Sequence, residues 1–175
     1  MTLKSSTYWK AVLMDRGNFL DRILAFLRAS GVPFCVIGGT GVNAYAAPVV
    51  TEDLDIVVAA SEIERVEADL RNHFKVERFA HSINVSEPPS RLQIQIQTDF
   101  RYFDFVRYAE VRSVMDYDLP VARLEDILQG KLWAVGDPAR RRSKRQKDLA
   151  DIARIIEVAP ELRERVPEEI LSKLI

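Results

Sequence analysis

The sequence predicts an α/β fold whose last part is entirely helical. Short apolar runs typical of strands alternate with stretches of helical periodicity as far as Pro120, and only helical spacing follows. The chain has 175 residues, of which 47% are hydrophobic and 29% are charged, and these values are ordinary for a globular protein. The length fits one compact domain, or one domain with a short appended unit.

The N-terminal part contains a helical region, a strand and a short helix. Apolar residues recur at helical spacing from about Ser5 to Ser30, which predicts one helix or a pair. Pro33–Ile37 is a short, partly β-branched apolar run typical of a buried strand. Gly38 and Gly39 form a tight turn, and Thr40–Ala47 is expected to be a short helix.

Two further strands flank a second predicted helix. Leu54–Val58 is apolar and β-branched, which predicts a strand. Ser61 begins a helix that extends to about Asn72, and Glu64 completes a capping box with Ser61. Phe74–Arg78 is expected to be the next strand.

Arg91–Thr98 has the clearest strand pattern of the chain. Three apolar residues alternate with three polar ones, which are Gln93, Gln95 and Gln97. One face of this strand is therefore apolar and the other is polar. The segment Asp99–Met115 has aromatic and apolar residues at helical spacing, which favours a helix.

Two helices are predicted after Pro120, over about Leu124–Val135 and Ala139–Ala159. Asp137 is a suitable N-cap for the second, because Pro138 would occupy the first helical position. Two later prolines divide the tail into short helical pieces.

Composition indicates a soluble protein without overall electrostatic targeting. Lys and Arg number 25 and Asp and Glu number 26, so the net charge is −1. The single cysteine cannot form an intrachain disulfide, and no segment has the pattern of a signal peptide or a membrane span. We expect a cytoplasmic protein that does not bind membranes.

The functional signal consists of a glycine turn followed by two carboxylates. A strand that leads through Gly38 and Gly39 into a helix presents free backbone N–H groups, which suit a phosphate. Asp53 and Asp55 lie two residues apart on a predicted strand, so both point to one face. Two such carboxylates repel each other unless a divalent cation neutralises them, and Mg²⁺ prefers oxygen ligands and phosphates.

Each motif alone commonly has a purely structural role, as a turn for the glycines and as a strand start for the aspartates. Their order and separation favour function, because metal-assisted nucleotidyl transfer needs a phosphate-binding turn beside an acidic strand. The stretch from Ile37 to Val58 resembles the signature of the DNA-polymerase-β-type nucleotidyltransferase superfamily. The segments Leu124–Ala134 and Arg145–Ile152 are similar to the AbiEii-type abortive-infection nucleotidyltransferases, whose toxin members pair with antitoxins.

The resemblance implies a mixed β-sheet core flanked by helices over residues 1–120. A helical part, residues 121–175, would pack over the nucleotide site. Gly38 and Gly39 match the phosphate loop, where Thr40 could replace a serine that many relatives use.

The same resemblance assigns charged residues to the reaction. Asp53 and Asp55 match the pair that binds Mg²⁺ or Mn²⁺. Lys131 matches a helix lysine that holds the nucleotide phosphates, and Asp148 matches a required acid of the last motif. Simpler roles are compatible with both residues, because Lys131 could extend its ammonium to solvent and Asp148 could be a surface acid.

The third carboxylate of the wider superfamily is missing from its expected strand. The polar face of Arg91–Thr98 carries only glutamines, which are neutral and cannot take a proton as a carboxylate does. Asp99, just beyond the strand, is charged and in phase. Either Asp99 reaches the site, or Asp148 acts instead, or a second metal is weakly held; Asp99 could also be a turn or helix cap.

A basic run of six residues offers a local surface for phosphates. Its members are Arg140, Arg141, Arg142, Lys144, Arg145 and Lys147. These side chains could bind an RNA acceptor or the nucleotide, or they could be a solvated helix start or contact an acidic partner protein.

We therefore expect a metal-dependent enzyme that moves a nucleoside monophosphate from a nucleoside triphosphate to an acceptor hydroxyl. The acceptor would be RNA such as tRNA, and the protein could be a toxin with a cognate antitoxin. Two alternatives are transfer to a protein side chain and a degenerate module that only binds nucleotide or a partner.

Overall fold

A computed structural model describes residues 10–11, 14–15 and 17–174 of the chain. Part of the helical region expected over Ser5–Ser30 lies outside these residues. Within the described residues of this region, Phe19–Ala29 form α2, whose buried residues are apolar and recur at helical spacing.

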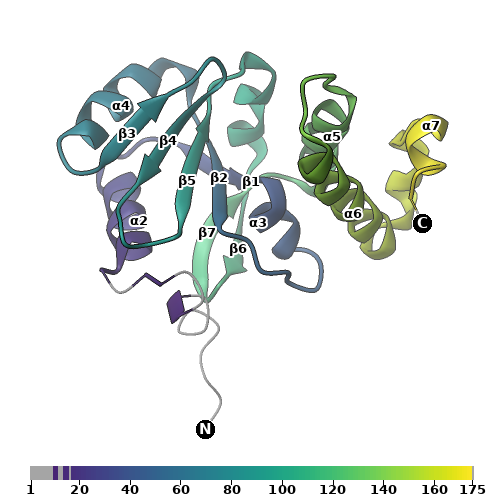
Figure 1. Cartoon of the computed structure of the whole chain (residues 1–175), viewed down its shortest axis with the longest axis horizontal. Helices are drawn as coiled ribbons and strands as arrows, with labels where there is room; N and C mark the ends of the chain where they lie inside the picture. The colour runs from purple at the N-terminus through teal and green to yellow at the C-terminus, as the bar shows by residue number, and fades with distance from the viewer. Residues whose placement is uncertain (1–9, 12–13, 16, 175) are drawn as a thin grey trace, which may run out of the picture.

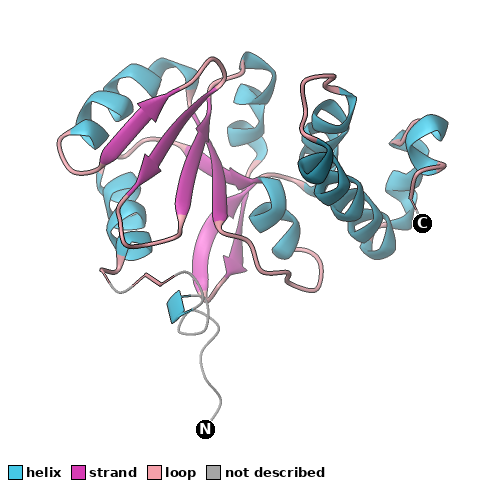
Figure 2. Ribbon diagram, viewed as in Figure 1, coloured by secondary structure: helices cyan, strands magenta, loops and turns pink. Residues whose placement is uncertain are grey.

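The strands form one mixed sheet in the order β3-β4-β5-β2-β1-β7-β6, drawn in magenta in Figure 2. Their bounds are β1 Phe34–Ile37, β2 Asp53–Val58, β3 Lys75–Arg78, β4 Ser82–Ser86, β5 Gln93–Gln97, β6 Glu110–Val114 and β7 Tyr117–Val121. Strand β2 runs antiparallel to β1 and parallel to β5, and β1 runs parallel to β7. The mixed sheet and its flanking helices confirm the predicted fold class.

Three strands were not predicted. The short β4 lies next to β5 and pairs with it in antiparallel register. The other two, β6 and β7, form a hairpin. Strand β6 lies in the segment where the sequence favoured a helix, and β7 contains Pro120, after which only helices were expected. The turn of the hairpin consists of Met115 and Asp116, both with positive φ, and these residue types gave no glycine or asparagine turn signal. The expected helix is only a 3₁₀ segment, η2 (Phe100–Tyr108).

Two helices begin at other residues than the sequence predicted. The short α3 (Gly38–Asn43) begins at the first glycine instead of Thr40. The expected capping box at Ser61 is wrong, because η1 (Ala60–Glu62) precedes α4 (Ile63–Arg71) and neither has a side-chain cap.

The C-terminal helices follow β7. They are α5 (Leu124–Gly136), α6 (Arg142–Val158), η3 (Pro160–Arg165) and α7 (Glu168–Leu171). Asp137 does not cap α6 as expected; it is the C-cap of α5, and its carboxylate accepts the N–H of Ala139. Figure 1 shows α5 and α6 beside the sheet, away from β3 and β4.

The hydrophobic core consists of buried side chains of the strands and of the helices that pack on the sheet. Helix α2 packs through Phe19 and Phe26 on Phe74, which lies between α4 and β3. On β2, Leu54 and Ile56 are fully buried. Their burial fixes the opposite orientation for the two aspartates that alternate with them.

Val36 of β1 connects three parts of the molecule. It is fully buried, pairs with Ile56 of β2 on one side and with Val121 of β7 on the other, and accepts the N–H of Ala122. The hydroxyl of Tyr45 donates to the carbonyl of Ala122, so the segment after α3 also contacts the start of the helical part. Within the described residues, no helix is both long and apolar enough to cross a membrane.

Candidate active site

A cleft of about 490 Å³ lies between the sheet and helices α5 and α6. The charged residues that line it are Asp53, Asp55, Lys131, Asp137, Arg140, Arg141, Lys144 and Asp148. Carboxylates from the sheet therefore face cations that come mostly from the segment between α5 and α6 and from α6. An anionic ligand that also carries a metal ion matches such a distribution of charge.

Gly38 fixes the position of one sheet carboxylate. Its φ is +64°, in the left-handed region, and a Cβ at this position would collide with the carboxylate of Asp55. Only glycine allows the backbone of this turn to lie so close to that side chain. Gly39 is close to a second acid, since a Cβ there would lie 3.7 Å from Oδ2 of Asp151.

We expect Gly38→Ala to lower the Tm by about 5 °C, because the variant adds left-handed strain and displaces Asp55. Thermal unfolding followed by circular dichroism measures this change. Gly136→Ala is the matched control, since a Cβ there meets no atom within 4 Å. Equal losses in both variants would contradict the close contact at Gly38.

Thr40 has a structural role in this site. Its hydroxyl is buried and donates to the carbonyl of Asp53 at 3.0 Å, and the residue does not line the cleft. The expectation that Thr40 binds a phosphate therefore lacks support. Its contact instead ties α3 to the first residue of β2.

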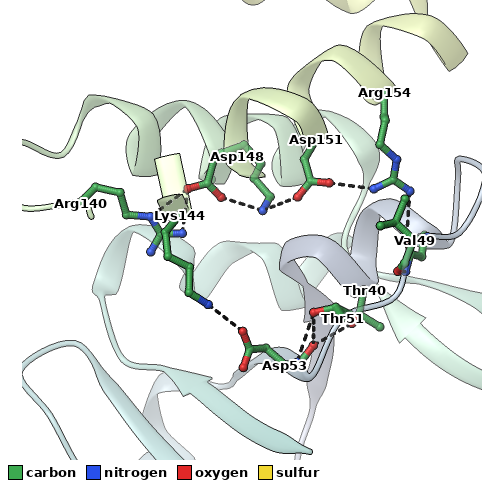
Figure 3. Close-up of polar contacts among 12 residues, drawn as sticks. Thr40, Val49, Thr51, Asp53, Arg140, Lys144, Asp148, Asp151 and Arg154 are labelled. Carbon is green, nitrogen blue, oxygen red and sulfur yellow. Dashed lines mark hydrogen bonds and ion pairs between the residues drawn. The ribbon is translucent and has the colours of Figure 1, made fainter. Parts of the chain in front are cut away.

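Asp53 and Asp55 lie on the cleft face of β2, as the two-residue spacing predicts. Oδ2 of Asp53 accepts from the ammonium of Lys144 at 2.9 Å (Figure 3). Desolvation raises the pKa of Asp55 to about 6, with a further contribution from the charge of Asp53; the cations of Lys131, Lys144 and Arg140 act in the opposite direction. The pair therefore favours a cation.

Lys131 is held inside the protein. Its ammonium lies 2.9 Å from Oδ1 of Asp148 and 2.7 Å from Oδ2 of Asp151, and its side chain is 11% exposed. Burial lowers the pKa of Lys131, but Asp151 and Asp148 more than offset this, so the pKa is raised. The alternative in which this ammonium extends to solvent is wrong.

Asp148 and Asp151 are parts of a chain of ion pairs and not surface acids. Asp148 is 2% exposed and also accepts from Arg140, at 2.8 Å. Asp151 accepts from Arg154 at 2.8 Å. The same guanidinium donates to Oδ1 of Asn43 and to the carbonyl of Ala47. The ion pairs thus join α5 to α6, and the hydrogen bonds of Arg154 extend this network to the end of α3 and the segment after it.

The structure divides the basic run into two groups. Arg140, Arg141 and Lys144 line the cleft, whereas Arg142, Arg145 and Lys147 do not. Arg142, the first residue of α6, is exposed, as is Lys147. Arg145 donates to the carbonyl of Asp137, which fixes the end of α5 to α6. Arg140, Arg141 and Lys144 can therefore contact a ligand in the cleft directly.

Amide side chains of β5, and no carboxylate of that strand, lie beside the two aspartates of β2. In the parallel pairing of β2 with β5, Asp53 is opposite Gln93 and Asp55 is opposite Gln95. Gln97 and Asn84 of β4 also line the cleft. Asn84 was not predicted as a site residue, because β4 was not predicted; the alternation Ser82–Ser86 was the available signal.

The structure does not bring Asp99 into the cleft. Its carboxylate accepts the backbone N–H of Arg101 as the cap of η2 and pairs with the guanidinium of Arg101, at 2.6 Å. These contacts with Arg101 hold the pKa of Asp99 below its usual value. The helix-cap alternative describes this residue, and the expectation of a catalytic carboxylate there is not supported.

Comparisons with known proteins identify the family and the fold. The family model described as "Nucleotidyl transferase AbiEii toxin, Type IV TA system" matches residues 19–174. No curated protein matches the chain.

Solved structures share the fold at low identity. The crystal structure of ANT(2″)-Ia in complex with adenylyl-2″-tobramycin has a TM-score of 0.59 and 14% identity, covering 89% of this chain and 97% of that chain. The lincosamide antibiotic adenylyltransferase LnuA, lincomycin-bound, has a TM-score of 0.54 and 14% identity, covering 78% and 95%. An antigenic nucleotidyltransferase-like protein from Paracoccidioides brasiliensis has a TM-score of 0.51 and 15% identity, covering 89% and 77%.

Proposed function

The chain belongs to the AbiEii family of nucleotidyl transferase toxins, and on that premise we propose that it moves a nucleoside monophosphate from a nucleoside triphosphate to a hydroxyl of RNA. Family membership makes the chain a transferase and bears out the sequence resemblance. The single observation that carries the proposal is the cleft in which Asp53 and Asp55 of β2 face Arg140, Arg141 and Lys144.

The donor set fits a divalent ion. Asp53 and Asp55 supply the oxygen ligands that Mg²⁺ or Mn²⁺ prefers, and the ammonium of Lys144 on Asp53 marks a place where positive charge is favourable. The ion, when bound, would neutralise phosphate charge and polarise the reacting phosphate. Among the described residues no group of three or more acidic, histidine or cysteine side chains could hold a metal alone, so substrate phosphates would complete the ligand set.

The side chains of the protein would bind and orient the substrates. Arg140, Arg141 and Lys144 would hold the triphosphate against the helical part, residues 121–175, and Lys131 would fix Asp148 beneath it. The acceptor oxygen then forms a bond to the α-phosphorus, the bond from that phosphorus to pyrophosphate breaks, and the hydroxyl proton is released to water. Catalysis would come mostly from positioning and charge neutralisation.

We expect divalent metal to bind weakly alone and strongly with nucleotide. Isothermal titration with Mn²⁺ should give an affinity at least about 10-fold higher in the presence of a non-hydrolysable nucleoside triphosphate analogue, because the phosphates add ligands. Asp53→Asn should remove this increase, while Asp104→Asn, an exposed acid outside the cleft, should keep it. Equal affinity with and without the analogue would count against the site.

Labelled nucleotides test the proposed reaction. The purified protein is incubated with each of four labelled nucleoside triphosphates, Mg²⁺ and total cellular RNA, and label is expected in RNA and absent with EDTA. Label in protein instead would favour the protein-modifying alternative. Nucleotide binding without transfer would favour a degenerate module, which the lack of a carboxylate on β5 makes a specific second candidate.

The family description also supports a cellular role. We propose that the protein is a toxin of a toxin–antitoxin pair, acting in the cytoplasm, where nucleoside triphosphates and RNA are present. Growth arrest on expression of the chain, and its relief by the product of a neighbouring gene, would test this role.

A further inference from the structure

The two sides of the cleft differ in charge. One side carries Arg140, Arg141 and Lys144. The other side is formed by β4 and β5 and carries only neutral amides among its polar side chains, namely Asn84, Gln93, Gln95 and Gln97. Asp53 and Asp55 of β2 lie between these sides, since β2 is the strand next to β5.

Strand register places two of these amides beside the two carboxylates. Gln93 is the partner of Asp53 and Gln95 is the partner of Asp55. Neighbouring strands lie about 4.8 Å apart and paired residues point to one face, so each carboxylate has an amide at its side. This placement depends on the backbone and holds whichever rotamers the glutamines adopt.

The same two amides are available to a ligand. Gln97 already accepts the backbone N–H groups of Thr98 and Asp99, and Asn84 accepts from the hydroxyl of Ser82. Within the described part of the chain, the side chains of Gln93 and Gln95 make no hydrogen bond. A polar group that faces a cleft without a protein partner is suited to bind a substrate.

The chemistry of the reaction assigns this side to the acceptor. In phosphoryl-type transfer the attacking and leaving oxygens lie roughly in line through the reacting phosphorus. The triphosphate, and with it the leaving pyrophosphate, would lie on the cationic side with Arg140 and Lys144. The attacking hydroxyl must then approach from the opposite side, over β5.

We infer that Gln93 and Gln95 form the acceptor subsite and bind the hydroxyl groups of the terminal ribose of RNA. This inference rests on the proposed function. An amide donates and accepts, as the 2′- and 3′-hydroxyls of a terminal ribose also do, and it adds no charge that would attract a cationic acceptor. The subsite thus selects an acceptor by its hydroxyls, and the 2′-hydroxyl distinguishes RNA from DNA.

The test is a cycle of two protein variants and two acceptors. One RNA oligonucleotide ends in ribose and its partner ends in 2′-deoxyribose, and the KM for each is measured with wild type and with Gln95→Met, a variant of similar size. Wild type should show a KM about 10-fold higher for the deoxy-terminated oligonucleotide. In Gln95→Met the KM for the ribose-terminated oligonucleotide should rise about 10-fold and the difference between acceptors should disappear.

Matched controls separate this role from a general defect. Gln129→Met changes an exposed glutamine of α5 outside the cleft and should leave every KM unchanged. The KM for the nucleoside triphosphate should stay within about 3-fold in Gln95→Met, which a loss of packing would not preserve. Should Gln95→Met fail to fold, Gln95→Ala is measured in its place, because it also removes the amide and adds no carboxylate beside Asp55, and the same loss of discrimination is expected. Discrimination that persists in the Gln95 variant overturns the inference.

Failure of the proposed function is distinguishable from failure of the inference. If wild type transfers no nucleotide to any RNA, the proposed function fails. Fluorescence anisotropy of the same two oligonucleotides, with Mg²⁺ and a non-hydrolysable nucleoside triphosphate analogue present, then decides the inference. About 10-fold weaker binding of the deoxy-terminated oligonucleotide to wild type, and not to Gln95→Met, supports it, and equal binding overturns it.

Discussion

Asp55→Asn is expected to reduce nucleotidyl transfer at least about 10³-fold without lowering the Tm at neutral pH. The variant removes one of two carboxylates that would hold the metal ion, so activity should fall. It also removes a charge that burial and Asp53 make unfavourable. Initial rates with labelled nucleotide, together with thermal unfolding, measure both effects.

The gain in stability has a defined pH dependence. Because the pKa of Asp55 is raised to about 6 in the folded protein, its ionised form destabilises the fold fully above pH 6. That cost disappears as pH falls from 6 towards the ordinary value near 4, where the folded protein already binds the proton. The Tm of Asp55→Asn should therefore be at least equal to wild type at pH 8, and any advantage should shrink by pH 5.

Asp104→Asn provides the comparison for both measurements, because Asp104 is exposed and lies outside the cleft. We expect wild-type activity and stability for it. An Asp55→Asn variant that keeps wild-type activity would remove the basis of the proposed reaction. A Tm lowered to the same extent at pH 5 and pH 8 would show that Asp55 stabilises the fold by some other contact.

Lys131→Met is expected to lower the Tm by about 10 °C, the second large effect. Methionine cannot replace the ammonium between Asp148 and Asp151, which are 2% and 13% exposed. Removing the shared cation from a buried pair costs about 3 kcal/mol, and each kcal/mol shifts the Tm of a chain of this size by about 2–4 °C. Differential scanning calorimetry measures the shift.

Two further variants test the buried ion pairs around Lys131. Lys147→Met changes an exposed lysine of α6 and should leave the Tm unchanged. The double variant Lys131→Met with Asp148→Asn should recover part of the lost stability, because it removes one of the carboxylates left without the ammonium. A double variant that is less stable by the sum of the single losses would show that the two residues do not interact.

Local patterns in the sequence predicted most of the sheet and both long helices. The alternation of Arg91–Thr98 and the two-residue spacing of Asp53 and Asp55 are period-two signals, and the structure has both on the expected faces. When one face of a strand is buried, the register is fixed, and so is the face to which each side chain points. The end of β1 before Gly38 was also predictable, although both glycines belong to α3 and not to a separate turn before it.

The parts that could not be predicted depend on contacts distant in sequence. The hairpin β6–β7 turns at Met115 and Asp116, which both have positive φ although neither is a glycine or an asparagine. Lys131 is 17 residues from Asp148, and only the packing of α5 on α6 brings their charged groups together. Tertiary contacts of this kind decide whether a lysine points to solvent or is enclosed.

The pairing of Val36 has a consequence for how this enzyme tolerates change. This one buried residue pairs with β2, which carries the two aspartates, and with β7, which leads into α5, and it lies two positions before the start of α3. Strand pairing, and not a flexible connection, therefore sets the distance between β2 and the segment that leads into α5. Loop insertions would leave this distance unchanged, whereas a larger side chain at Val36 would displace β2 and β7 together.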